Sequence, residues 1–176
     1  TKDSRTEPKK ERDIDIYIGL SGYASSVDIS GVETNFKGGS FNVGASINNG
    51  AHKTRVGLLY LSTSVDTLEV DGLDYDFESL GASIDYTGFG VEVSHSYFVN
   101  DTVGFGGYVS ATSGDLELCS AGECQKDGAK TFEYGVRVDF KVSAWNPYIA
   151  VGSTKYDDGD SYKGTSAYVG LLNFEF

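Results

Sequence analysis

The chain has 176 residues and a formal net charge of -12, with 14 Lys and Arg against 26 Asp and Glu. This acidic balance argues against a nucleic-acid partner, because phosphate binding requires clustered basic side chains. Hydrophobic residues make up 39% of the chain, which excludes disorder over its whole length. No apolar run reaches the roughly 18 residues of a membrane helix, although the strands of a membrane barrel need only alternate apolar and polar residues.

Residues 1–13 carry charges of both signs and show no periodic spacing of apolar residues. We expect this segment to be a flexible tail, followed by one domain over residues 14–176. From Ile14 onward apolar residues recur at every second position, which is the period of a β-strand. The first such segment places on one face Ile14, Ile16, Ile18 and Leu20. The pattern predicts an all-β domain.

The clearest strand covers residues 132–142. One face holds Phe132, Tyr134, Val136, Val138, Phe140 and Val142, and the other holds Glu133, Gly135, Arg137, Asp139 and Lys141. A helix would mix these two sets. Residues 54–62 are apolar on both faces in their middle, and we orient Val56 and Leu58 outward because Arg55 then points inward.

The connections between about eight predicted strands alternate in length. Short connections, with residue types typical of hairpin turns, cover residues 48–51, 99–101 and 143–146. Long connections lie around Gly31, at residues 65–77, around the two cysteines and at residues 156–164. This alternation is typical of outer-membrane barrels and places both termini at the end with the short turns.

Two of the long connections contain candidate site residues. Cys119 and Cys124 are expected to form a disulfide, which implies an oxidising compartment; the alternative is two free thiols in a cytosolic loop. Asp157, Asp158 and Asp160 resemble part of a calcium loop, but the later Glu of such a loop is absent, so a polar turn is the simpler interpretation. We expect no cofactor.

Alternation alone does not decide which face of the barrel is apolar. In a soluble lipocalin-like calyx the apolar face lines a ligand cavity, whereas in a membrane barrel it faces lipid. An outward row running to the last residue favours the membrane: Tyr168, Gly170, Leu172, Phe174 and Phe176. Two interfacial girdles are expected from Tyr97, Tyr134, Phe140, Trp145 and Tyr168. A network of paired charges is expected in the lumen, formed by Arg55, Glu92, Glu133, Arg137, Asp139 and Lys141.

Three stretches, VGLLNFEF, FEYGVRVDFKV and YFVNDTVGFGGYVSA, resemble those of small outer-membrane β-barrels of the OmpA transmembrane-domain or OmpX type. The resemblance implies an eight-stranded antiparallel up-and-down transmembrane barrel whose polar lumen is filled by side chains. It also implies a bacterial outer-membrane location with extracellular long loops and periplasmic termini, in contact with lipopolysaccharide. The ending is similar to the signal read by the barrel assembly machinery, carried here by Gly170, Leu172, Phe174 and Phe176.

The function expected from these features is non-enzymatic. Six carboxylates and no Lys or Arg lie between Asp66 and Glu78, so the long loops are acidic and suit a surface partner or divalent cations. Adhesion, surface assembly or membrane integrity are the roles considered first, and a narrow channel or lateral-gate transporter is the alternative. A calyx and a lipid-modifying enzyme rank lower, because the sequence around His95 does not match the His and Ser spacing of lipid A deacylases.

Overall fold

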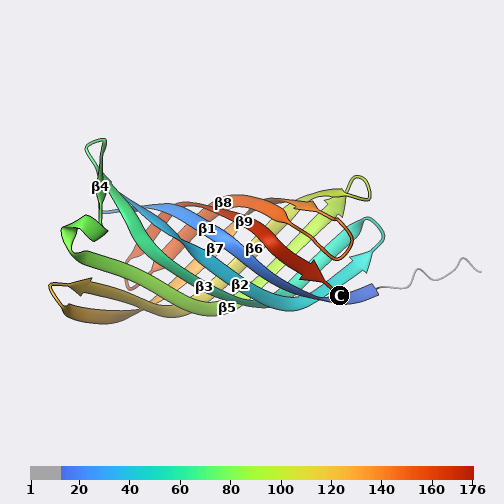
Figure 1. The fold of residues 1–176 in the computed structure, drawn as a ribbon, viewed down its shortest axis with the longest axis horizontal. Coiled ribbons are helices and arrows are strands. Elements are labelled where there is room, and N and C mark those ends of the chain that lie inside the picture. The colour runs from blue at the N-terminus through green and yellow to red at the C-terminus, as the bar shows by residue number, and fades with distance from the viewer. Residues whose placement is uncertain (1–12) are drawn as a thin grey trace, which may run out of the picture.

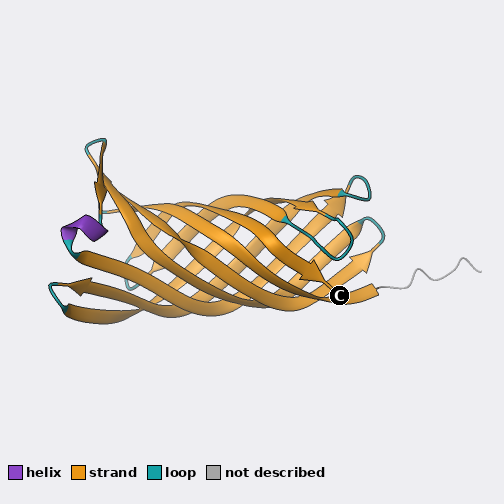
Figure 2. Cartoon of the chain, in the orientation of Figure 1, coloured by secondary structure: helices purple, strands orange, loops and turns teal. Residues whose placement is uncertain are grey.

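The computed structural model describes residues 13–176 and consists almost entirely of strands (Figures 1 and 2). The predicted tail lies outside the described residues, apart from Asp13, which begins the first strand. The elements are β1 (Asp13–Ile29), β2 (Val32–Asn49), β3 (His52–Val70), β4 (Leu73–Asp76), the 3-10 turn η1 (Glu78–Leu80), β5 (Ala82–Phe98), β6 (Val103–Ser120), β7 (Glu123–Phe140), β8 (Tyr148–Asp157) and β9 (Ser161–Glu175).

The strands form one closed antiparallel ring. The sheet order is β2-β1-β9-β8-β7-β6-β5-β3-β4, and pairing between β2 and β3 closes it. Because β4 pairs with β3 alone, it is a side extension, and eight strands make up the barrel wall. The predicted eight-stranded up-and-down barrel is therefore confirmed. Within residues 13–176, no helix is long and apolar enough to cross a membrane.

Apart from the β-bulges, side chains alternate between the two faces of the wall. On β7, Tyr134 and Val136 are 54% and 63% exposed, whereas Glu133 and Arg137 are 1% and 4% exposed. On β3, Val56 and Leu58 face outward and Arg55 faces inward, as predicted. The apolar face is thus the outer one, which is the reverse of a soluble calyx.

The two ends of the barrel differ, as Figure 1 makes visible. We call one the hairpin end; it carries the turns at residues 30–31, 71–72, 121–122 and 158–160. The other, the terminal end, carries residues 50–51, 99–102 and 141–147, the start of β1 and the C-terminus. The expectation of long loops at the hairpin end was wrong in one respect. Three of these segments are extended β-hairpins, closed by Ser30-Gly31, Asp71-Gly72 and Ala121-Gly122, each with positive φ at both residues.

A β-bulge in β9 shifts the facing of the last strand. Opposite β1, Leu20 pairs with Leu172, but Gly22 pairs with Val169, so β9 carries one extra residue there. Tyr168 and Gly170 consequently face the lumen, while Leu172 and Phe174 face outward. The outward row predicted from Tyr168 to Phe176 is therefore wrong for its first two members, because period-two counting assumes an unbroken ladder.

Candidate functional site

Six charged side chains meet inside the barrel towards its terminal end, and we call them the charge cluster. Each is at most 8% exposed: Lys53, Arg55, Glu92, Arg137, Asp139 and Glu175. They come from β3, β5, β7 and β9. Each projects inward because it lies on the polar face of its strand. Three positive and three negative groups balance, as a buried set must for its desolvation to be offset.

Ion pairs join this cluster across the lumen. Asp139 accepts hydrogen bonds from Arg137 Nη2 at 2.6 Å and Arg55 Nη1 at 2.9 Å, and a third from the Ser96 hydroxyl. Glu175 in turn accepts hydrogen bonds from Arg55 Nε at 2.8 Å and Lys53 Nζ at 2.5 Å. The chain of contacts thus ties three non-adjacent strands, β3, β7 and β9, together through their side chains.

Neutral groups complete the packing. Glu92 accepts hydrogen bonds from Asn42 Nδ2 at 3.0 Å and the Tyr17 hydroxyl at 3.4 Å. The guanidinium of Arg137 lies over the ring of Tyr148, 4.0 Å from its centroid, in cation–π geometry. The space left between these side chains is about 10 Å³, which is at most enough for a single water molecule.

Four of the six residues predicted for the lumen network meet in the charge cluster, and the structure differs from the prediction at Lys141, Glu133 and Lys53. Lys141 follows the end of β7 and is exposed, because the chain leaves the wall at Phe140. Lys53, which the sequence reasoning did not select, takes a place in the cluster. The inward facing of Lys53 could have been predicted from the sequence, because Lys53 lies two residues before Arg55 and therefore on the same face of the strand.

Glu133 lies apart from the cluster among tyrosines. Its carboxylate accepts hydrogen bonds from the hydroxyls of Tyr23, at 2.5 Å, and Tyr168. Tyr156 lies 3.5 Å from the Tyr23 hydroxyl. No ion pair reaches Glu133 among residues 13–176, so phenol groups replace a cation as its partners. The girdle position predicted for Tyr168 is therefore wrong, because the β9 bulge turns this ring into the lumen.

The remaining predicted girdle residues lie on or near the outer surface. Tyr97, Tyr134 and Trp145 are 50%, 54% and 40% exposed, and Phe140 is partly buried. Trp145 donates a hydrogen bond to the Leu171 carbonyl at 2.6 Å, which fixes the β7–β8 turn against the end of β9. Among the four residues of the predicted insertion signal, Leu172, Phe174 and Phe176 are exposed and Gly170 faces inward.

The hairpin end carries most of the exposed carboxylates. Those of the β3–β4 hairpin and η1 are partly or fully exposed: Asp66, Glu69, Asp71, Asp74, Asp76 and Glu78. In the β8–β9 turn, Asp157 and Asp158 accept hydrogen bonds from the Gly159 and Asp160 amides at 3.3 and 3.2 Å. Partial burial and the carboxylates of Asp158 and Asp160 raise the pKa of Tyr162. A disulfide joins Cys119 to Cys124 near the tip of the β6–β7 hairpin.

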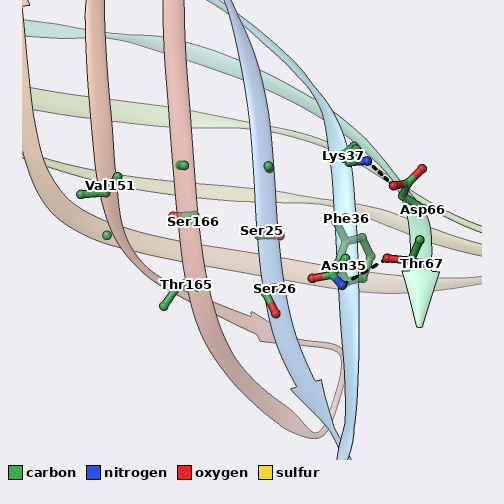
Figure 3. A pocket seen from close by; sticks show the side chains of 13 residues that line it. Ser25, Ser26, Asn35, Phe36, Lys37, Asp66, Thr67, Val151, Thr165 and Ser166 are labelled. Atoms are coloured by element: carbon green, nitrogen blue, oxygen red, sulfur yellow. Dashed lines mark hydrogen bonds and ion pairs between the residues drawn. The ribbon is translucent and has the colours of Figure 1, made fainter. Parts of the chain in front are cut away.

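A hollow of about 800 Å³ lies on the wall where β8, β9, β1, β2 and β3 run side by side (Figure 3). Small side chains leave this space open, among them Ala24, Gly152 and Ala167. One acid and one base line it, Asp66 and Lys37, and they pair with each other. The hollow therefore provides a concave apolar surface, but none of its lining side chains is arranged for acid–base or nucleophilic chemistry.

A closed ring of eight antiparallel strands, apolar outside and charged inside, defines the fold of the small outer-membrane β-barrels. Three solved structures of this class are similar to the chain. Neisserial surface protein A has a TM-score of 0.60 and 12% identity, over 92% of this chain and 97% of that one. Ail, the attachment invasion locus protein of Yersinia pestis, solved with the heparin analogue sucrose octasulfate, has a TM-score of 0.52 and 18% identity, over 93% and 99%.

The third is a major outer membrane protein from Thermus thermophilus, with a TM-score of 0.50 and 11% identity, over 93% of this chain and 100% of that one. No protein-family model and no curated protein matches the sequence. At these identities the likeness establishes the fold. The resemblance to small barrels of the OmpA or OmpX type is confirmed at that level.

Proposed function

We propose that this chain is a non-enzymatic barrel of the bacterial outer membrane that presents its hairpin end to the outside and acts through contacts made there. The observation that carries the proposal is the apolar outer surface of a closed ring. Exposed Ile16, Leu58 and Val136 would be unfavourable in water, whereas in a bilayer they contact lipid and the closed ring leaves no unpaired strand edge.

Heat-modifiability tests this setting. The detergent-extracted membrane fraction is compared with and without boiling on a denaturing gel, and we expect the unboiled protein to migrate differently because the barrel resists the detergent. Recovery in the soluble fraction with no mobility shift would contradict an outer-membrane location. Thiol labelling of intact cells tests the orientation: Asp74→Cys at the hairpin end should be labelled from outside, and Asp101→Cys at the terminal end should not.

The filled lumen belongs to the same proposal. The charge cluster closes the terminal half with ion pairs, and the tyrosines around Glu133 fill the other half, so a structural role for these charges is preferred to transport. Planar-bilayer recording tests it, and we expect no stable conductance. A narrow channel is the second candidate, because buried polar atoms such as Ser40 Oγ, Ser94 Oγ and Thr154 Oγ1 have no protein partner within residues 13–176. Steady single-channel steps would favour it.

The acidic hairpins are the proposed contact surface. Ail was solved with a sulfated heparin analogue, but the carboxylates around Asp71 and Asp74 would repel such an anion. A basic partner or divalent cations shared with lipopolysaccharide phosphates fit this charge. We expect the purified barrel to bind immobilised polylysine and not heparin, and the variant Asp71→Asn/Asp74→Asn/Asp76→Asn to lose most of this binding.

The matched control for that variant is Asp13→Asn/Asp15→Asn/Asp101→Asn, which removes three partly or fully exposed carboxylates from the terminal end. Its polylysine binding should stay close to that of the unaltered chain. Equal losses in both variants would mean that net charge alone drives binding and would remove the hairpins from the proposal, while leaving the outer-membrane setting untouched.

Insertion through the barrel assembly machinery is proposed to depend on the exposed aromatic residues of β9. Phe174→Ala/Phe176→Ala should lower the amount of heat-modifiable protein in the outer membrane severalfold, whereas refolding of the purified variant into detergent should change little. An unchanged amount in cells would leave these two residues with a lipid-contacting role alone.

A further inference from the structure

Two histidines far apart in the sequence lie together on the outer wall at the terminal end. His52 is the first residue of β3, directly after the turn at residues 50–51, and His95 lies near the end of β5. In the β3–β5 ladder His52 is opposite Tyr97 and Thr54 is opposite His95, so the two imidazoles are diagonal neighbours on one face. Both side chains are exposed, and neither contributes to the lumen or to the acidic hairpins.

The separation of the two ring nitrogens is the first observation. His52 Nδ1 lies 3.3 Å from His95 Nε2, and the ring centroids are 5.4 Å apart with the planes inclined by 31°. Two imidazole nitrogens bound to one tetrahedral Zn²⁺ at about 2.0–2.1 Å lie about 3.3–3.4 Å from each other. The pair therefore already has the spacing of two ligands of one ion.

The surroundings of the pair supply the second observation. His95 Nδ1 lies 2.9 Å from the Thr54 hydroxyl. A proton on Nδ1 donated to that oxygen leaves Nε2 unprotonated and able to bind an ion, which is how a second contact commonly fixes the tautomer of a ligating histidine. The Tyr97 ring packs against His52 at 5.2 Å between centroids and limits its rotation. Both rings are thus held by neighbours on a rigid two-strand ladder.

We propose that His52 Nδ1 and His95 Nε2 chelate one divalent transition-metal ion, Zn²⁺ being the ion that fits their spacing. The site offers two protein ligands and leaves the remaining positions to water or to a ligand from another molecule. It is consequently weaker than a closed four-ligand structural site. Its place beside the short turns keeps it within reach of ions in water, so the proposal rests on these contacts and not on the function proposed for the hairpins.

Calorimetric titration of the full, untagged chain in detergent with Zn²⁺ alone tests the site. We expect saturable binding of one ion per chain, reversed by a chelator, and at least a tenfold loss of affinity in His52→Gln and in His95→Gln. Thr54→Val should weaken binding less than either, because it removes the contact that orients His95 and no ligand.

Carboxylates at the hairpin end are the competing sites, and Asp157→Asn/Asp158→Asn is the matched control, expected to leave the Zn²⁺ affinity unchanged. Each variant must retain its heat-dependent mobility shift, which shows that the barrel has folded. The proposal is overturned if Zn²⁺ fails to bind saturably, or if both histidine variants bind it as tightly as the unaltered chain.

Discussion

Among single residues inside the barrel, those that balance charge are expected to contribute most to its stability. Asp139 is fully buried and is the meeting point of Arg55 and Arg137. Asp139→Asn keeps the shape of the side chain but leaves two buried guanidinium groups short of a counter-charge. We expect the free energy of unfolding to fall by about 3–5 kcal/mol, the usual cost of breaking a buried pair. Urea titration of the folded barrel in lipid or detergent measures it.

The exposed pair formed by Lys37 and Asp66 is the control for this prediction. Asp66→Asn should change the free energy of unfolding by no more than about 1 kcal/mol, because water and ions already screen the pair. Similar losses for Asp139→Asn and Asp66→Asn would mean that the lumen is wet enough to screen its own charges.

The tyrosine partners of Glu133 permit a second comparison of single residues. Tyr168→Phe removes one of the two phenol donors to a buried carboxylate, and we expect a loss of about 1–3 kcal/mol in the free energy of unfolding. Tyr134→Phe removes a hydroxyl from an exposed ring and should stay within about 0.5 kcal/mol. The reverse order in urea titrations would place Tyr168 on the outer face, as its spacing from Phe176 alone suggested.

These residues also mark the limit of what could be predicted from the sequence. The inward facing of Arg55, Arg137 and Asp139 follows from parity, because one charged residue fixes the facing of its strand. The facing of Tyr168 could not be predicted in this way. The strand carries apolar residues both before and after the bulge, so the bulge cannot be recognised from the alternation. Specific contacts, such as the two bonds from Arg55, depend on the shear of the closed ring and are not encoded in any local pattern.

At the scale of elements, close approach of strands explains why certain positions must be glycine. A Cβ built on Gly106 would lie 1.8 Å from the carbonyl oxygen of His95, whereas one on Gly107 would lie 3.3 Å from that of Gly135. Gly106→Ala should therefore force β5 and β6 apart and lower the free energy of unfolding by about 1–3 kcal/mol or prevent refolding. Gly107→Ala should refold normally, and equal behaviour of the two in refolding yields would contradict the strand spacing.

The end of the β6–β7 hairpin is held on one side by β5, which pairs with β6 as far as Ser120, whereas β7 pairs with β8 only over residues 130–139. We therefore expect the tip to open more readily than the wall. Cys119 and Cys124 face each other near its tip, and a loop this short contributes about 2 kcal/mol in the chain-entropy description. Cys119→Ser/Cys124→Ser should speed proteolytic cleavage at the tip severalfold while leaving the heat-dependent mobility shift intact, because hairpin tips open independently of the wall. Loss of that shift would mean that the hairpin is part of the cooperative barrel.

The number and order of the strands were predicted better than their lengths. The strands around Val136 and Ile16 and the turn at Gly50-Ala51 follow from alternation and turn chemistry. The hairpins at Gly31 and Gly122 were expected to be loops. In the proposed setting they lie beyond the bilayer, where both faces of a strand meet water and the alternation fades. Strand pairing persists there through the backbone, which leaves no mark in the side-chain pattern.

For the whole molecule, the proposed outer-membrane location means that lipid, not water, surrounds the barrel wall. A charge placed on that wall should then cost more free energy the deeper it lies. Val136 is 63% exposed on the part of β7 that pairs with β8, and Val70 is 40% exposed beside the turn that closes the β3–β4 hairpin. In a bilayer, Val136→Arg should lower the free energy of unfolding by about 2–4 kcal/mol and Val70→Arg by about 0–1 kcal/mol. Urea titration in lipid vesicles measures both, and a barrel surrounded by water would tolerate the two substitutions equally.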